Sequence, residues 1–277
     1  AGWVGKALVG LPGLCGFGVA SLEEGAELRS ALTMRNRKVR IVVFSGCAPW
    51  NDDKGQFCEE HGLTPVIATE EDWNQFFKKG WPARLPYELK FNTGMNRLGL
   101  PAGLARQVAQ RFKDKPSEWH PQGVFSHLAL GENPRAKLSL QQRERFLAVR
   151  AEFSGPCPAT QFHLANSAGI WNRKDWGLDG LTDIVRPGLA LYGVPPWSDA
   201  PLRGLQSVMT LEAQVIAVHR LKAGESVGYG AAYTVSGGEP AHVAILGAGY
   251  ADGVPRALKG QGTGGGFAWA GGRAERF

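Results

Sequence analysis

The stretch YELKFNTG, residues 87–94, decides how this sequence folds. Its first five residues predict a strand, and the Asn-Thr-Gly that follows predicts a turn at the end of that strand. Further strands are predicted on both sides of the quoted stretch, over residues 38–44, 64–68, 123–128, 160–164 and 184–192. Pro187 interrupts the last of them, because proline cannot donate a backbone hydrogen bond.

Helices are predicted in the intervals between these strands. Ser21 followed by Glu24 predicts a capped helix over residues 21–32, and Pro101 suits the first turn of a helix over residues 101–113. Strands that alternate with helices over about 190 residues predict a parallel βα array, either a barrel or an open doubly wound sheet. Two more helices are predicted over residues 70–79 and 140–153, the second with Leu140, Phe146, Leu147 and Phe153 as its main apolar side chains.

The pattern changes after Pro195 and Pro196. Residues 208–221 and 241–246 are predicted strands, with no long helix between or after them. We therefore expect a partial βα barrel over residues 1–204 and the first part of an all-β domain over residues 205–277. The abrupt start and the glycine-rich end predict an internal piece of a longer protein. A Gly-x-Gly-x-x-Gly at residues 260–265 lacks the flanking strand and helix of a nucleotide site.

Composition excludes several classes of protein. The 277 residues are 43% hydrophobic, which is too apolar for a disordered chain, and no apolar run approaches the roughly 20 residues of a membrane helix. The four cysteines and six histidines show no metal-ligand spacing, and free thiols suit a reducing cytoplasm. The net charge of +6 allows an anionic ligand, but no known nucleic-acid motif is present. We interpret the basic run at residues 35–40 as a solvated approach to a strand.

Charged and polar side chains follow the predicted strands at their carboxyl ends. In a parallel βα barrel these ends meet at one face, where catalytic sites lie. A face with two arginines, one lysine and two histidines predicts an anionic ligand, either a phosphate, a carboxylate or both. The residues concerned are Lys90, Arg97, His127, His163, Asn166, Ser167, Arg186 and Gly188.

Five motifs give the sequence a resemblance to a known family. They occur in the family's order and are spread over about 170 residues, so together they are far more specific than any one of them. On these motifs the chain resembles the alanine racemases. The motifs are ELKFNTGMNRLGL at residues 88–100, HLANSAGI at 163–170, VRPGLALYG at 185–193, VGYGAAYT at 227–234 and GYADGVPR at 249–256.

The resemblance implies a fold and an activity. The family's fold is a TIM-type (β/α) barrel, here N-terminally incomplete, followed by a C-terminal β domain. The family uses pyridoxal 5'-phosphate (PLP) to interconvert L-alanine and D-alanine, with two bases that exchange the α-proton. Its members are cytoplasmic homodimers with shared active sites, and their D-alanine supplies the bacterial cell wall.

The resemblance also implies roles for individual residues. Tyr229 matches the catalytic base, which acts in the partner subunit's site. Arg97 and Tyr250 match substrate-binding residues, and Lys90 matches a supporting lysine that is carbamylated in many members. Arg186 matches the arginine that faces the pyridine nitrogen, and His163 matches the residue that braces it. The remaining cofactor contacts are His127 at the ring, Ser167, Gly188 and Leu189 at the phosphate, and Asn166.

The chain departs from the family pattern at both ends. The family's K-A-x-A-Y-G segment with the Schiff-base lysine is not found, and Lys6 lies outside any such motif. The G-R-x-x-M-D segment is also absent, and Asn92 stands where many members have aspartate. Two hypotheses follow: a piece of a true racemase that is inactive by itself, or a non-catalytic barrel that binds PLP or another phosphate ligand. A K-A-x-A-Y-G segment upstream of Ala1 would favour the first.

Overall fold

The computed structural model describes residues 1–277 except 33–37, 202–203, 211, 232 and 255–277. The chain divides into two compact units, Ala1–Val208 and Met209–Phe277. Each unit has its own set of strands.

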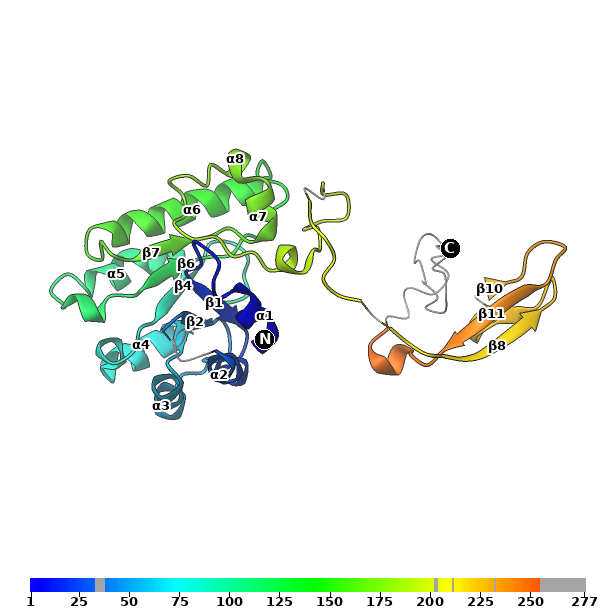
Figure 1. Cartoon of the computed structure of the whole chain (residues 1–277). Coiled ribbons are helices and arrows are strands. Elements are labelled where there is room, and N and C mark those ends of the chain that lie inside the picture. Colours follow the sequence, from blue (N-terminus) through cyan, green and yellow to red (C-terminus); the bar gives the residue numbers. More distant parts are fainter. Residues whose placement is uncertain (33–37, 202–203, 211, 232, 255–277) are drawn as a thin grey trace. The chain divides into compact units, whose positions relative to one another are not determined.

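The first unit is built on a parallel sheet (Figure 1). Its strands lie in the order β1-β2-β3-β4-β6-β7, with β5 beside β4, and every pair is parallel. The order follows the chain without reversal, which is the arrangement of a barrel wall and not of a doubly wound sheet. The strands are β1 (Gly16–Val19), β2 (Arg40–Val43), β3 (Thr64–Ile67), β4 (Glu88–Asn92), β5 (Leu100–Pro101), β6 (Gly123–Phe125) and β7 (Gln161–His163).

Helices lie between the strands, and Figure 1 shows α2 to α6 on the outside of the curved sheet. The predicted capping is confirmed: the Ser21 hydroxyl accepts a hydrogen bond from the Glu24 amide at 3.3 Å. Asn51 and Thr69 begin α3 and α4 in the same way. The α-helices are α1 (Gly2–Leu8), α2 (Leu22–Ala31), α3 (Asp52–His61), α4 (Glu70–Lys78), α5 (Ala105–Gln110), α6 (Lys137–Ser154), α7 (Ser167–Trp171) and α8 (Arg173–Trp176).

The main hydrophobic core lies between the sheet and these helices. Leu89 and Phe91 of β4 pack there with Phe146 and Phe153 of α6. A smaller cluster on the other face of the sheet contains Phe125. Because successive side chains of a strand point to opposite faces, the residues that alternate with the core residues face the barrel interior.

Several predicted elements differ from the observed ones. Residues 184–192 do not form a strand: Ile184 makes one isolated parallel bridge to His163, and a 3-10 helix, η5 (Leu189–Tyr192), follows Pro187. The helix predicted from residue 101 is shorter, since Pro101 belongs to β5 and η3 (Ala102–Leu104) precedes α5. Leu140 and Leu147 of α6 are exposed, unlike Phe146 and Phe153.

The second unit contains only strands and short 3-10 turns among its described residues. Strand β8 (Val215–Leu221) pairs antiparallel with β11 (Ala241–Leu246), and β9 (Ser226–Val227) pairs antiparallel with β10 (Tyr233–Thr234). The expected all-β character is confirmed for this part of the chain. The turns η6 (Tyr229–Ala231) and η7 (Tyr250–Asp252) carry the two tyrosines of the sequence motifs. The Gly-x-Gly-x-x-Gly at 260–265 lies outside the described residues.

Candidate functional site

Alternation along the strands places a group of polar side chains in the barrel interior. Leu89 of β4 belongs to the main core, so Glu88 and Lys90 face inward. His163 ends β7 and stacks on the inward-facing Phe125 of β6, with ring centroids 4.6 Å apart and planes at 10°. Strand β4 thus brings a carboxylate and an ammonium, and β7 an imidazole, to one region beside Phe125 of β6.

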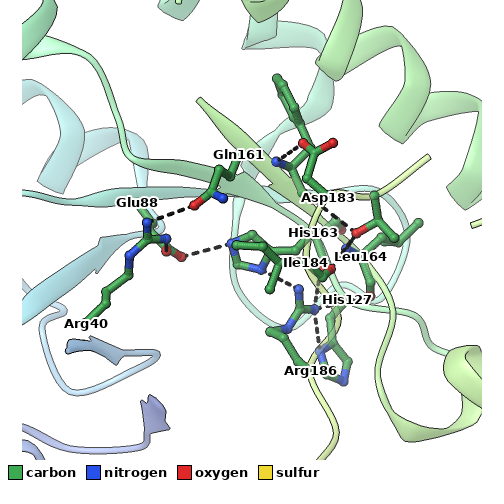
Figure 2. Close-up of polar contacts among 12 residues, drawn as sticks. Arg40, Glu88, His127, Gln161, His163, Leu164, Asp183, Ile184 and Arg186 are labelled. Atoms are coloured by element: carbon green, nitrogen blue, oxygen red, sulfur yellow. Dashed lines mark hydrogen bonds and ion pairs between the residues drawn. The ribbon is translucent and has the colours of Figure 1, made fainter. Parts of the chain in front are cut away.

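Arg186 joins this group from the segment after β7, as Figure 2 shows. Its Nη1 lies 2.6 Å from Nδ1 of His163. Its Nη2 donates to the backbone oxygens of Ser126 at 2.7 Å and Leu164 at 3.2 Å, and lies 3.4 Å from Nδ1 of His127. These contacts anchor the guanidinium to the ends of β6 and β7.

Arg186 stays positively charged at neutral pH in these surroundings. Burial of the guanidinium lowers the pKa of Arg186 to about 10, and the Glu88 carboxylate opposes that change. The residue as a whole is half-buried, so part of its side chain still reaches solvent. Arg186 is therefore a fixed positive group at neutral pH, with hydrogen-bond donors and no acceptor.

Lys90, His127 and Arg97 surround this centre with further basic groups. Lys90 is 6% exposed, and burial, followed by the charges of Arg97 and Arg186, lowers its pKa to about 8. Burial, followed by Arg186, Arg97 and Lys90, lowers the pKa of His127 to about 4. Arg97 itself is exposed in the turn after β4. At neutral pH His127 is uncharged, and the positive charges of Lys90, Arg97 and Arg186 strengthen the prediction that the site takes an anion.

Small polar groups lie beside the basic centre at the start of α7. The Ser167 hydroxyl accepts hydrogen bonds from the backbone amides of Gly188 at 2.9 Å and Ala190 at 3.3 Å. Asn166 caps α7 through the Gly169 amide, and its amide nitrogen lies 3.4 Å from Nε2 of His127. Apart from its two chain neighbours, the described residues place no heavy atom within 4 Å of the point where a Gly188 side chain would begin. Open space beside a hydroxyl and backbone amides fits a phosphate group.

Lowered histidine pKa values predict a specific acid sensitivity. The unfolded chain protonates His127 near its ordinary pKa of 6.5, but the folded chain does so only near 4. Stability is thus present above pH 6.5 and falls as the pH drops toward 4. With about 1.36 kcal/mol per pH unit and partial solvent screening, we expect a loss of about 1–2 kcal/mol.

Urea unfolding at pH 7 and at pH 4.5 measures this loss. His127→Gln should make the difference between the two pH values smaller. It should not abolish the difference, because burial also lowers the pKa of His163. His61→Gln, on α3 outside the site, is the matched control and should leave the difference unchanged. Equal pH dependence in wild type and His127→Gln would contradict the assignment.

The other predicted site residues lie elsewhere. Leu189 begins η5 and is 52% exposed. Tyr229 begins η6 and Tyr250 begins η7, both in the second unit, and the Tyr250 side chain is exposed. Lys6 is an exposed residue of α1. The structure thus brings together the residues predicted from the barrel and describes the two tyrosines within a separate unit.

Sequence reasoning missed Glu88 and misjudged Arg40. Glu88 is 1% exposed and lies 3.1 Å from Nε2 of His163. Arg40, interpreted above as part of a solvated run, is half-buried: its guanidinium contacts Glu88 at 3.3 Å and the Gln161 side chain at 2.8 Å. The signal available was the spacing of Glu88 and Lys90, two charged residues on one face of a strand that is otherwise buried.

The described residues contain no group of three His, Cys, Asp or Glu side chains that could hold a metal ion. Among the helices that the structure describes, none is long and apolar enough to cross a membrane.

Comparison with known proteins gives consistent matches. Residues 2–196 match the family model described as alanine racemase, N-terminal domain, and residues 208–275 match alanine racemase, C-terminal domain. Alanine racemase from Rhizobium meliloti is 35% identical over 89% of this chain and 60% of its own. The biosynthetic enzyme of Agrobacterium fabrum is 34% identical over 89% of this chain and 58% of its own.

Solved structures agree with the sequence matches. The biosynthetic alanine racemase of Pseudomonas aeruginosa superposes with a TM-score of 0.72 at 32% identity, covering 88% of this chain and 64% of its own. That of Bartonella henselae, with covalently bound pyridoxal phosphate, gives 0.65 at 30% identity, covering 89% and 64%. The chain therefore spans roughly three fifths of the length of these relatives.

Proposed function

Because the chain belongs to the alanine racemase family, we propose that the protein interconverts L-alanine and D-alanine with pyridoxal phosphate as its cofactor. The observation that carries this proposal is Arg186, a permanently protonated group held by His163 and by two backbone oxygens. A guanidinium in this place suits a ring nitrogen that must stay unprotonated.

The residues present fit the cofactor by their chemistry. Ser167, Gly188 and Leu189 would hold the phosphate and His127 would contact the ring. Asn166, which lies beside His127, would be a further cofactor contact. Bound pyridoxal phosphate supplies an electron sink for the α-carbon. Arg186 does not give up its guanidinium proton to the ring nitrogen. The electron sink is therefore weaker, and return of a proton to the α-carbon of the substrate is favoured.

The substrate is held and deprotonated by other residues. Arg97 offers a planar fork of donors to the alanine carboxylate, and its exposed position after β4, where its charge acts on Lys90 and His127, supports this role. Tyr229 acts as one of two bases, and Tyr250 contributes to the substrate site. The second base is the lysine that tethers the cofactor, a role that we do not assign to Lys6.

Lys90 is proposed to carry a carbamate that orients Arg97. Its lowered pKa of about 8 leaves much of the amine neutral at pH 8, whereas an ordinary lysine would be almost fully protonated. The neutral amine attacks carbon dioxide, an N–C bond forms, and one proton is released to solvent. The resulting anion is stabilised by the neighbouring charges of Arg97 and Arg186.

Carbon-13 NMR with labelled bicarbonate tests this at pH 8. We expect a carbamate signal that weakens by roughly fivefold from pH 8 to pH 7, as the amine becomes protonated. The signal should be absent in Lys90→Met and retained in Lys6→Met, an exposed lysine of α1. A signal that survives Lys90→Met would assign the carbamate to another lysine.

The biological setting follows from the activity. We propose a cytoplasmic homodimer in which Tyr229 completes the partner subunit's site, and whose D-alanine enters peptidoglycan. We also propose that residues 1–204 form the PLP-binding barrel and that residues 205–277 form part of the β domain.

A direct assay separates this function from passive cofactor binding. Full-length protein is incubated with PLP and L-alanine, and D-alanine is measured with a D-amino-acid oxidase. Borohydride reduction followed by mass spectrometry then locates the modified lysine. Conversion in both directions supports the racemase, with the adduct expected outside Lys6. PLP binding without conversion would instead support a non-catalytic barrel protein.

A further inference from the structure

We propose that Glu88 is a positioning residue that holds His163 as the neutral imidazole with its proton on Nε2, leaving Nδ1 to accept from Arg186. The functional consequence rests on the proposed racemase, but the proton's position does not. Glu88 reaches His163 from β4 across β6, on the side of the imidazole away from Arg186 (Figure 2).

The contact between Arg186 and His163 defines one side of the ring. Nη1 of Arg186 lies 2.6 Å from Nδ1 of His163. A guanidinium has only donors, so Nδ1 must be the acceptor and cannot carry a proton. A doubly protonated ring would place two N–H groups against each other. Burial lowers the pKa of His163 and, with the charges of Arg186 and Arg40, outweighs Glu88, which raises it.

The opposite ring nitrogen faces Glu88. Nε2 of His163 lies 3.1 Å from Oε2 of Glu88, and the two side chains are 3% and 1% exposed. Neither atom has another hydrogen-bond partner in the described part of the chain. A carboxylate only accepts, so a bare Nε2 would leave two buried acceptors facing each other. A proton on Nε2, directed at Oε2, removes that conflict.

Neighbouring basic side chains keep the Glu88 carboxylate negatively charged. Burial alone raises the pKa of Glu88, but contact with the His163 imidazole, which donates a hydrogen bond in the neutral state proposed here, and the charges of Arg40 and Arg186 lower the pKa below its ordinary value. Nη1 of Arg40 lies 3.3 Å from Oε1, and Nη2 donates to Gln161 at 2.8 Å. Arg40 and Gln161 begin their strands, so the polar chain runs from the start of the strands to Arg186.

Gly123 makes room for this pair. In the sheet register Gly123 of β6 lies between Glu88 and Gln161 of the flanking strands. A β-carbon at this position would lie 2.8 Å from the Glu88 carboxyl carbon and 3.0 Å from Nε2 of His163. The absence of a side chain therefore allows Glu88 to reach the imidazole across β6.

The position of the proton can be observed directly. Full-length protein labelled with ¹⁵N-histidine gives long-range proton–nitrogen spectra that distinguish the two neutral tautomers and the charged ring. Comparison with His163→Gln assigns the signals. We expect one Nε2-protonated tautomer at pH 7–8, with and without PLP. An Nδ1-protonated or charged ring in the wild type would overturn the proposal, whatever the activity.

Glu88→Gln tests whether Glu88 causes this state. Arg40 attracts the amide oxygen, so the amide nitrogen turns its hydrogens toward Nε2 and opposes the preference set by Arg186. We expect mixed tautomers, and a 10- to 100-fold lower kcat with little change in KM for alanine, the size seen when a supporting partner of a functional group is lost. Glu59→Gln, which removes an exposed ion pair with Arg84, is the matched control.

The outcomes separate the two proposals. An unchanged tautomer together with an unchanged kcat in Glu88→Gln would mean that Arg186 alone orients the ring, and Glu88 would lose its role. A wild-type protein that shows the Nε2 tautomer but no alanine conversion would refute the racemase and leave the assignment of the proton intact.

Discussion

Arg186→Glu in the full-length protein is expected to lower alanine racemisation by about 100-fold or more, since it removes the fixed positive charge that we place at the ring nitrogen of the cofactor. A carboxylate at this position would accept a hydrogen bond from a protonated ring nitrogen and would strengthen the electron sink that bound pyridoxal phosphate supplies, which slows return of the proton to the α-carbon. We also expect pyruvate as a side product.

The substitution also disturbs the local structure. Glutamate cannot donate to the backbone oxygens of Ser126 and Leu164, and each buried acceptor left unpaired costs about 1–3 kcal/mol. Urea unfolding should accompany the kinetic assays for this reason. Arg186→Lys keeps the charge without the fork, and Arg106→Glu, at an exposed position of α5, reverses a charge outside the site. Full racemase activity in Arg186→Glu would place Arg186 away from the cofactor.

Tyr229→Phe is expected to lower racemisation by about 10²- to 10⁴-fold, the contribution of a positioned acid–base group. The substitution removes only the hydroxyl, so one of the two bases is lost while the other can still exchange the α-proton. Solvent deuterium should therefore still enter one enantiomer of alanine faster than the protein converts it. Tyr233→Phe, four residues away in β10 and 51% exposed, is the matched control.

Mixing the two inactive variants tests whether the sites are shared. If Tyr229 completes the partner subunit's site, a hybrid dimer of Tyr229→Phe and Arg186→Glu chains has both defects in one site and none in the other. Random exchange at equal concentrations should then restore roughly a quarter of the wild-type activity. Activity that stays at the level of the separate variants after confirmed subunit exchange would argue against sharing.

Much of the barrel could be predicted because its strands are short, apolar segments separated by capped helices. Residues 64–68 and 87–91 illustrate this, and both overlap observed strands. Residues 184–192 misled the prediction, since apolar residues around Pro187 resemble a strand although they form only one bridge and a 3-10 turn. Strand β1 (Gly16–Val19) was missed, because its glycines indicate turns in a single sequence.

The sequence by itself determined the alternation of strands and helices, the basic residues at the strand ends and the five motifs that identify the family. These depend on local spacing along the chain. Only the tertiary structure decided how Arg40, Glu88, His163 and Arg186 connect. They come from positions up to 146 residues apart, and their contact depends on sheet register, on the room that Gly123 leaves and on burial. A buried charge is tolerated only where an opposite charge or a hydrogen-bond partner lies next to it in the fold. The order of residues alone does not show which side chains will lie next to each other.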